Sequence, residues 1–117
     1  KLAKDVIDKR VKSSAELLHI ENLLDRYPSQ VSGGQRQRIA VARAIVSRPA
    51  LVLADEPTAN LDSHTLADLM ELFTELNQHH NTTFIIATHD QRVMRYAKRL
   101  VRMLDGRIVE DNAQNAA

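Results

Sequence analysis

Two adjacent carboxylates, Asp55 and Glu56, follow a short apolar run at residues 51–54. An uninterrupted apolar run of this length, closed by Pro57, predicts a strand that is buried on both faces. Carboxylates at the carboxyl end of such a strand lie where open α/β sheets bind ligands. Asp55 could there hold Mg²⁺, usually through water, and Glu56 could orient or deprotonate a water molecule. A solvated strand end is the alternative interpretation, because two acids after an apolar run are common.

A second candidate site is the run Ser32-Gly33-Gly34-Gln35, which precedes a helical pattern. Serine followed three residues later by glutamine is a capping box, which accounts for the first and last residues of the run. The glycines are not explained in this way, since each costs about 1 kcal/mol relative to alanine in a helix. Adjacent glycines in a first helical turn indicate that something approaches the backbone closely. Because the free amides of a helix N-terminus bind phosphate readily, the run predicts phosphate contact, with a plain capped helix as the alternative.

A third polar group, Thr88-His89-Asp90, lies at the end of a second predicted buried strand, at residues 82–88. If the two apolar runs form neighbouring parallel strands, His89 and Glu56 follow their strands at the same sheet edge. A polar side chain at that edge could stabilise a transferring phosphoryl group. A histidine at a strand end is also commonly an ordinary surface residue, and this alternative stays open on sequence alone.

The elements that must position these groups form an α/β pattern. Apolar side chains at helical spacing predict helices over residues 3–18 and 35–46, and a third helix capped by Asp62 or Ser63. The stripe of this third helix that should face the core is Leu66, Leu69, Met70, Phe73 and Leu76. Strand, helix and strand in succession predict a βαβ unit with parallel strands and a right-handed crossover.

The last third of the chain predicts a small separate motif. Residues 91–98 have the pattern of a short helix, and Asp105-Gly106 between two apolar segments is a favoured hairpin turn. Residues 112–117 are polar and are expected to form a disordered tail.

Composition excludes several classes of protein. Length (117 residues) suits one domain, and the absence of cysteine excludes disulfide scaffolds and thiolate zinc sites. Aromatic residues make up 3% and the net charge is +1, so neither stacking platforms nor a strongly basic surface for nucleic acid is expected. No apolar run approaches the length of a membrane span.

Taken together, three segments closely resemble ABC-type ATPases. Residues 31–38 (VSGGQRQR) resemble that family's signature motif, residues 55–62 (DEPTANLD) its Walker B motif and D-loop, and residues 87–90 (ATHD) its H-switch. The resemblance covers residues 1–111. The sequence of the second segment is most similar to that of ATP-binding subunits of the lipoprotein-release and macrolide-export type.

The resemblance implies a role for each candidate residue. It implies that Asp55 holds Mg²⁺ through water, Glu56 is the general base for the attacking water, and His89 contacts the γ-phosphate. Asp62 is then the D-loop acid that communicates across a dimer. Ser32, Gly33, Gly34 and Gln35 would bind the γ-phosphate of ATP held by a second ATP-binding subunit in a head-to-tail dimer.

The resemblance also implies partners and a location. Such subunits power transport through transmembrane permease subunits, and they lie in the cytoplasm on the inner face of the cell membrane. The implied fold is a partial P-loop NTPase fold of parallel strands flanked by helices, with a C-terminal β-hairpin and without the P-loop strand. Residues 1–34 would be the end of the helical subdomain with the signature loop, and residues 35–111 the C-terminal part of the catalytic core.

The sequence contains no phosphate loop of the form GxxxxGKS or GxxxxGKT. ATP and Mg²⁺ are therefore expected as cofactors of the full-length protein, and this chain alone is expected to bind neither and to hydrolyse no ATP. The missing strand would leave a hydrophobic sheet edge unpaired, which predicts self-association.

Two alternatives to a transport ATPase remain at this point. One is an ABC-type ATPase of DNA repair or chromosome maintenance, although residues 1–30 show one short amphipathic helix where such proteins insert long coiled coils. The other is a catalytically silent dimerisation module.

Overall fold

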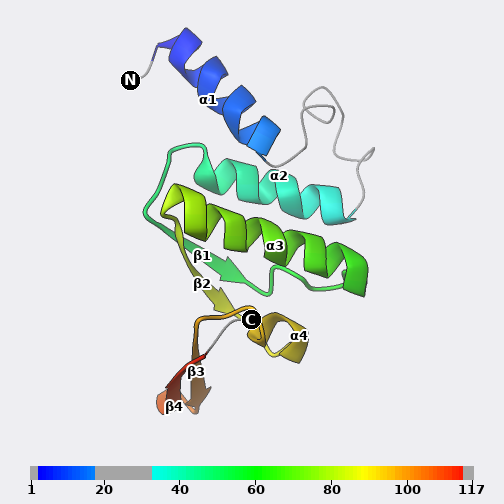
Figure 1. The fold of residues 1–117 in the computed structure, drawn as a ribbon, viewed down its shortest axis with the longest axis vertical. Coiled ribbons are helices and arrows are strands. Elements are labelled where there is room, and N and C mark those ends of the chain that lie inside the picture. The colour runs from blue at the N-terminus through cyan, green and yellow to red at the C-terminus, as the bar shows by residue number, and fades with distance from the viewer. Residues whose placement is uncertain (1–2, 18–32, 115–117) are drawn as a thin grey trace. The chain divides into compact units, whose positions relative to one another are not determined.

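A computed structural model describes residues 3–17 and 33–114, which form two compact units (Figure 1). The first unit comprises Lys1–Ala87 and the second Thr88–Ala117. Ser32, one of the candidate phosphate-binding residues, lies outside the described residues. Among the described residues, no helix is both long and apolar enough to cross a membrane.

The first unit contains the predicted strand–helix–strand arrangement. Its elements in chain order are α1 (Lys4–Leu17), α2 (Gly33–Ile45), β1 (Leu51–Asp55), α3 (Ser63–His80) and β2 (Thr83–Ala87). Strands β1 and β2 pair in parallel, with Leu51 opposite Thr83 and Asp55 opposite Ala87. The prediction of neighbouring parallel strands joined by a helix is therefore confirmed, and Figure 1 shows α3 between α2 and the strands.

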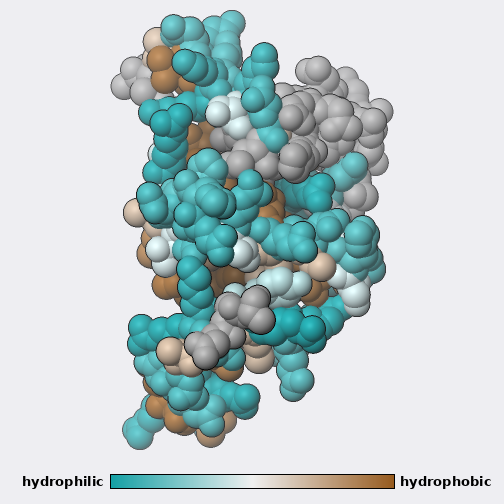
Figure 2. Space-filling view, in the orientation of Figure 1, coloured by the Kyte–Doolittle hydropathy of each residue, from teal (hydrophilic) through white to brown (hydrophobic). Residues whose placement is uncertain are grey.

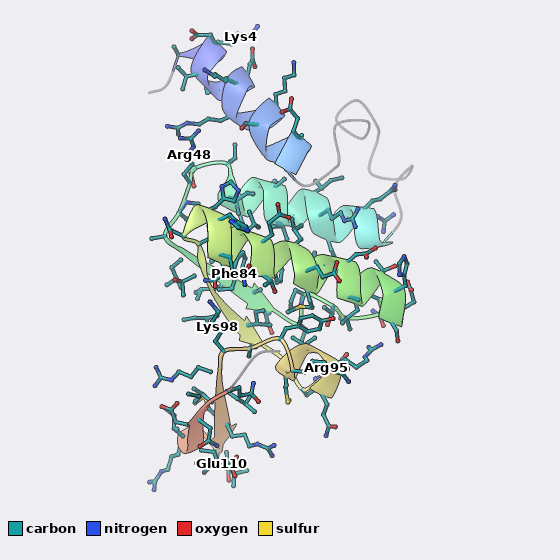
Figure 3. The ribbon with its side chains drawn as sticks, viewed as in Figure 1. Lys4, Arg48, Phe84, Arg95, Lys98 and Glu110 are labelled. Atoms are coloured by element: carbon teal, nitrogen blue, oxygen red, sulfur yellow. The ribbon has the colours of Figure 1, made fainter. Side chains whose placement is uncertain are left out.

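Helix α3 supplies most of the core. All five residues of its predicted apolar stripe are buried, and Leu72 is buried with them. The Phe73 ring stacks on the Phe84 ring of β2, with centroids 4.6 Å apart and an angle of 17° between the rings. Figure 3 labels Phe84 where β2 meets α3. Such aromatic pairs add about 0.5–1.5 kcal/mol to the area that they bury, so this contact holds the helix on the sheet.

Within the described residues, only one face of the sheet is covered. The prediction that β1 is buried on both faces is therefore wrong for this part of the chain. Val52 of β1 is 8% exposed, whereas Leu53 is 72% exposed and Ile85 of β2 is 56% exposed. Side chains alternate between the two faces of a strand, and α3 packs on the face that carries Phe84. The opposite face therefore presents apolar side chains outward.

Helix α1 matches the predicted helix over residues 3–18, but much of its apolar spacing is exposed. Its bounds agree with the predicted helix, and it contacts α2. Of its apolar residues, Ala15 is 1% exposed, but Ile7 and Val11 are exposed. The apolar spacing thus predicts the helix correctly, while Ile7 and Val11 on its apolar stripe stay exposed among the described residues.

The second unit is a one-turn helix followed by a hairpin. It comprises α4 (Gln91–Met94), β3 (Arg99–Leu104) and β4 (Arg107–Ala113), and the two strands pair antiparallel. Asp105 and Gly106 have φ of 50° and 78°, which is the backbone that the predicted hairpin turn requires. Figure 2 shows apolar side chains at the surface of this hairpin, where Met103, Leu104, Ile108 and Val109 are exposed.

The prediction of a disordered tail from residue 112 is wrong for residues 112 and 113, and residues 115–117 lie outside the described residues. Asn112 and Ala113 belong to β4, because they pair with the start of β3, and Arg99 forms an ion pair with Asp111 at 2.6 Å. The Gln114 side chain also donates hydrogen bonds to the backbone carbonyl oxygens of Met94, at the end of α4, and of Ala97, three residues after it. A polar composition indicates disorder only where no strand lies alongside, and cross-strand pairing cannot be read from composition.

Candidate functional site

The two adjacent acids lie at the carboxyl end of β1. Asp55 is the last residue of the strand and is exposed. The Glu56 backbone N–H donates a hydrogen bond of 2.8 Å to the Ala87 carbonyl oxygen, at the end of β2. The acids are therefore placed at the sheet edge where parallel α/β sheets bind ligands.

Glu56 has an unusual backbone for a glutamate. Its φ is 45°, in the left-handed region that costs a residue with a Cβ about 1–2 kcal/mol. The turn that follows is anchored by Pro57 and Thr58, both buried, with Thr58 2% exposed. The Glu56 carbonyl also accepts a hydrogen bond of 3.1 Å from the Ala59 N–H. These contacts hold Glu56 in a conformation that turns the chain sharply at the end of β1, and such strained residues often occur at functional sites.

Asp62 caps α3. Its Oδ2 accepts the backbone N–H of His64 at 3.1 Å and of Thr65 at 3.2 Å. Its Oδ1 accepts the Thr65 hydroxyl at 2.5 Å. These bonds, of which the Thr65 hydroxyl bond has the largest effect, hold the pKa of the Asp62 carboxyl below its usual range. Of the two caps that the sequence allows, Asp62 is the one used.

The glycine pair opens α2, which starts at Gly33 rather than at the predicted residue 35. A Cβ added at Gly34 would collide with Cγ2 of Thr65. The close approach that the glycines predict is therefore present at Gly34, and the approaching group is a side chain of α3. Gln35 is half-buried in the first turn of the same helix.

A second contact joins α2 to α3 one turn further along. The Arg38 guanidinium lies 3.8 Å from the Asp68 carboxylate. Both contacts advance in the same direction on the two helices, so α2 and α3 run side by side with the same sense, as Figure 1 shows. Val41 and Ile45 of α2 are buried.

His89 belongs to the second unit and follows the end of β2 by two residues. It is exposed and sits between two residues that bond to each other, because Thr88 Oγ1 accepts the Asp90 N–H at 3.0 Å. Asp90 caps α4 and forms a 2.7 Å ion pair with Arg92. The Arg92 hydrogen bond, chiefly, lowers the pKa of the Asp90 carboxyl.

Sequence reasoning missed Thr65 and assigned no role to Thr88 or Asp90. The signal for Thr65 is its place three residues after the Asp62 cap, the position at which a side chain bonds back to a capping residue. The signal for Asp90 is a short acidic side chain immediately before a helix. Both are local patterns, but the contact of Thr65 with Gly34 joins two separate helices and has no sequence signature.

The donor atoms at the sheet edge fit only part of a metal site. Among residues 3–17 and 33–114, no group of three or more His, Cys, Asp or Glu side chains could hold a metal ion. Mg²⁺ commonly takes one or two carboxylates together with water and substrate phosphates. The exposed carboxylate of Asp55 fits such a partial role and does not form a site by itself.

Comparisons with known proteins agree on one family. A family model described as ABC transporter matches residues 3–59. The macrolide export ATP-binding/permease protein MacB of Rhodopirellula baltica is 53% identical over 94 residues, which is 80% of this chain and 14% of that protein. The lipoprotein-releasing system ATP-binding protein LolD of Buchnera aphidicola is 42% identical over 110 residues, 92% of this chain and 48% of that protein.

Solved structures match over nearly the whole chain. An ATP-binding cassette dimer in a post-hydrolysis state with ADP and Pi has a TM-score of 0.80 and 33% identity, covering 97% of this chain and 49% of that one. The cbiO1 protein of Clostridium perfringens, part of an ABC transporter complex, has a TM-score of 0.89 and 35% identity, covering 97% of this chain and 45% of that one. The chain therefore spans about half or less of the relatives that it matches.

The strained backbone at Glu56 yields a stability prediction. We expect Glu56→Gly to be more stable than Glu56→Ala by about 0.5–1 kcal/mol, because glycine adopts a positive φ without the Cβ clash and loses only part of that gain to its more flexible unfolded state. Both variants lack the carboxylate, so their difference isolates the backbone. Urea unfolding measures it, and an alanine variant equal to or more stable than the glycine variant would contradict the assignment.

The Asp62 cap yields a pH prediction. Because folding lowers this pKa, the carboxylate stabilises the chain above the ordinary value of 3.8 and the effect is lost as pH falls through the lower folded value. We compare the melting temperature with that of Asp62→Asn, which retains a capping side chain without the charge. The difference should be largest at neutral pH and vanish at strongly acidic pH. A difference that stays constant with pH would rule out the carboxylate as the source.

Proposed function

The chain belongs to the ABC transporter ATPase family, and on that premise we propose that it forms the signature, Walker B, D-loop and H-switch part of an ATP-binding subunit of a transporter. The observation that carries the proposal is the placement of Asp55 and Glu56 at the carboxyl end of a parallel strand, followed by the Asp62 cap of α3. This is the sheet edge at which an α/β protein binds a nucleotide.

In this proposal the acids divide the work of ATP hydrolysis. The Glu56 carboxylate accepts a proton from the water that attacks the γ-phosphate, and it does so from a turn of positive φ. Asp55 holds Mg²⁺ through water, and the ion, when bound, offsets the charge of the phosphates. His89 donates a hydrogen bond to the γ-phosphate from the exposed turn between Thr88 and Asp90.

The glycine end of α2 serves a second subunit. Ser32, Gly33, Gly34 and Gln35 bind the γ-phosphate of ATP that a partner ATP-binding subunit holds, and the N-terminal amides of α2 favour such an anion. Asp62 communicates between the two subunits of this head-to-tail dimer. The existence of a solved relative as a dimer bound to ADP and Pi supports this arrangement.

The wider assembly follows from the names of the relatives. One relative combines ATP-binding and permease functions in its name, and others belong to a lipoprotein-releasing system. We therefore propose transmembrane permease partners and a position on the inner face of the cell membrane. These transport names do not favour an ATPase of DNA repair or chromosome maintenance.

The absence of a phosphate loop from these 117 residues bears on whether the chain can bind ATP by itself. That loop supplies the amides and the lysine that hold the β- and γ-phosphates, and the 117 residues contain none. In the proposal this chain binds no ATP by itself and contributes its residues to ATP held elsewhere, either by the rest of its own domain or by a partner.

A mixing experiment tests the contribution to ATP held by a partner. We combine the chain with an intact ATP-binding cassette subunit whose own general-base glutamate is replaced by glutamine, so that bound ATP persists. We expect no ATP binding by the chain alone in calorimetry. With the intact subunit we expect a complex that forms with ATP and Mg²⁺ but not with ADP, detected by light scattering after size-exclusion chromatography.

Two matched glutamine variants test whether the glycine end of α2 contacts the ATP held by the intact subunit. Gln35→Ala should weaken the complex about tenfold, the effect of losing one hydrogen bond to a charged group. Gln78→Ala, at an exposed glutamine of α3, should leave it unchanged. A complex that forms equally with ADP, or equal affinities for the two variants, would contradict the proposal. Association without any nucleotide would instead support a silent dimerisation module.

We also propose that the chain associates with itself through the sheet. The sheet has two strands among the described residues, so an edge of β2 carries no backbone partner there and its exposed face is apolar. Such edges pair with other chains. We expect the average mass in light scattering to rise with concentration, and Ile85→Lys to suppress the rise. Leu104→Lys, at an exposed residue of the hairpin, is the control. A monomer at all concentrations would exclude the proposal.

A further inference from the structure

Gly34 has a packing role within its own subunit. A Cβ at this position would collide with Cγ2 of Thr65, so the first turn of α2 can lie this close to α3 only with glycine there. A glycine in a helix otherwise costs stability. The contact therefore gives a reason for the second glycine that involves no ligand.

The Thr65 side chain is held in place at its other end. Its hydroxyl donates a 2.5 Å hydrogen bond to Oδ1 of Asp62, and its backbone N–H donates to Oδ2 of the same carboxylate. Threonine has few χ1 rotamers, and this hydroxyl bond selects one of them. The methyl group that faces Gly34 is thus set by the side chain that caps α3.

The rest of the α2–α3 interface keeps the two helices in register. The Arg38–Asp68 ion pair lies one turn beyond the glycine contact. Asp68 also lies 3.6 Å from His64 Nε2 on its own helix. Val41 of α2 is buried still further along. Because the later turns are packed, a displacement of Thr65 acts on the first turn of α2.

We propose that Thr65 is a positioning residue that couples Asp62 to the glycine end of α2 inside one subunit. Its hydroxyl group binds the capping carboxylate, and its methyl group limits how closely Gly34 approaches. A movement of Asp62 therefore moves the methyl group and with it the first turn of α2. The consequence for nucleotide binding rests on the proposed function, whereas the contact itself is testable without nucleotide.

The first experiment measures the glycine–methyl contact by thermal unfolding of the 117-residue chain. Alanine is ordinarily more stable than glycine in a helix, so Gly34→Ala should raise the Tm unless the added Cβ clashes. We expect it to lower the Tm by several degrees in the wild-type background. In a Thr65→Ser background, which keeps the hydroxyl and removes the methyl, Gly34→Ala should raise the Tm.

A matched control uses the other threonine on α3 that bonds through its hydroxyl. Thr74 Oγ1 donates to the Met70 carbonyl oxygen at 2.9 Å, away from Gly34. In a Thr74→Ser background Gly34→Ala should still lower the Tm. If Gly34→Ala raises the Tm in the wild-type chain, or lowers it equally in the Thr65→Ser and Thr74→Ser backgrounds, the proposal is wrong. If Gly34→Ala does not fold, refolding of the double variant with Thr65→Ser supports the proposal, and failure of both overturns it.

The second experiment separates the two ends of the threonine. Thr65→Val keeps the methyl group and lacks the hydroxyl, so the pKa of the Asp62 carboxyl should rise toward its ordinary value in an NMR titration. Thr65→Ser should leave that pKa low. A role in packing alone would leave the Asp62 titration unchanged in both variants, and that result would overturn the proposed coupling. None of these measurements uses ATP, so they are independent of the outcome of the mixing experiment.

Discussion

The parallel pairing of β1 with β2 is the constraint on which the first unit depends. Parallel strands cannot be joined by a short turn and need a crossover, which here is α3. The crossover must cover the sheet, and its apolar stripe with the Phe73–Phe84 stack does so. It must also begin near the end of β1, which places Asp62 a few residues after Asp55 and Glu56. The candidate acids and the cap of α3 are therefore consequences of one topology.

The start of α3 then serves two purposes. The Asp62 side chain accepts hydrogen bonds from two backbone amides of the first turn and from the Thr65 hydroxyl, and the methyl group of Thr65 packs on Gly34. A glycine that is costly inside a helix becomes necessary once another side chain occupies the space of its Cβ. The first turns of α2 and α3 therefore pack directly on each other, and no ligand takes part in this contact. The first segment resembles a signature motif, and the second follows a segment that resembles a D-loop.

Much of this structure could be predicted locally. The spacing of apolar residues predicts α3 and its buried stripe, the two apolar runs predict β1 and β2, and Asp105-Gly106 predicts the hairpin turn. These features follow from side-chain periodicity and turn chemistry, which act over a few residues. The outward-facing Leu53 and the extension of β4 to Ala113 could not be predicted in this way. Burial and cross-strand pairing depend on what lies across from a residue.

By itself the sequence determined the family, to which a family model matches residues 3–59, and it indicated the candidate residues through three short segments that resemble motifs of that family. It also determined that no phosphate loop is present in these 117 residues. Only the tertiary structure decided that Glu56 takes a left-handed backbone and that Thr65 fills the space beside Gly34. The physical reason is that motifs record the types of side chains, whereas strain and steric contact arise from backbone conformation and from elements distant in the chain.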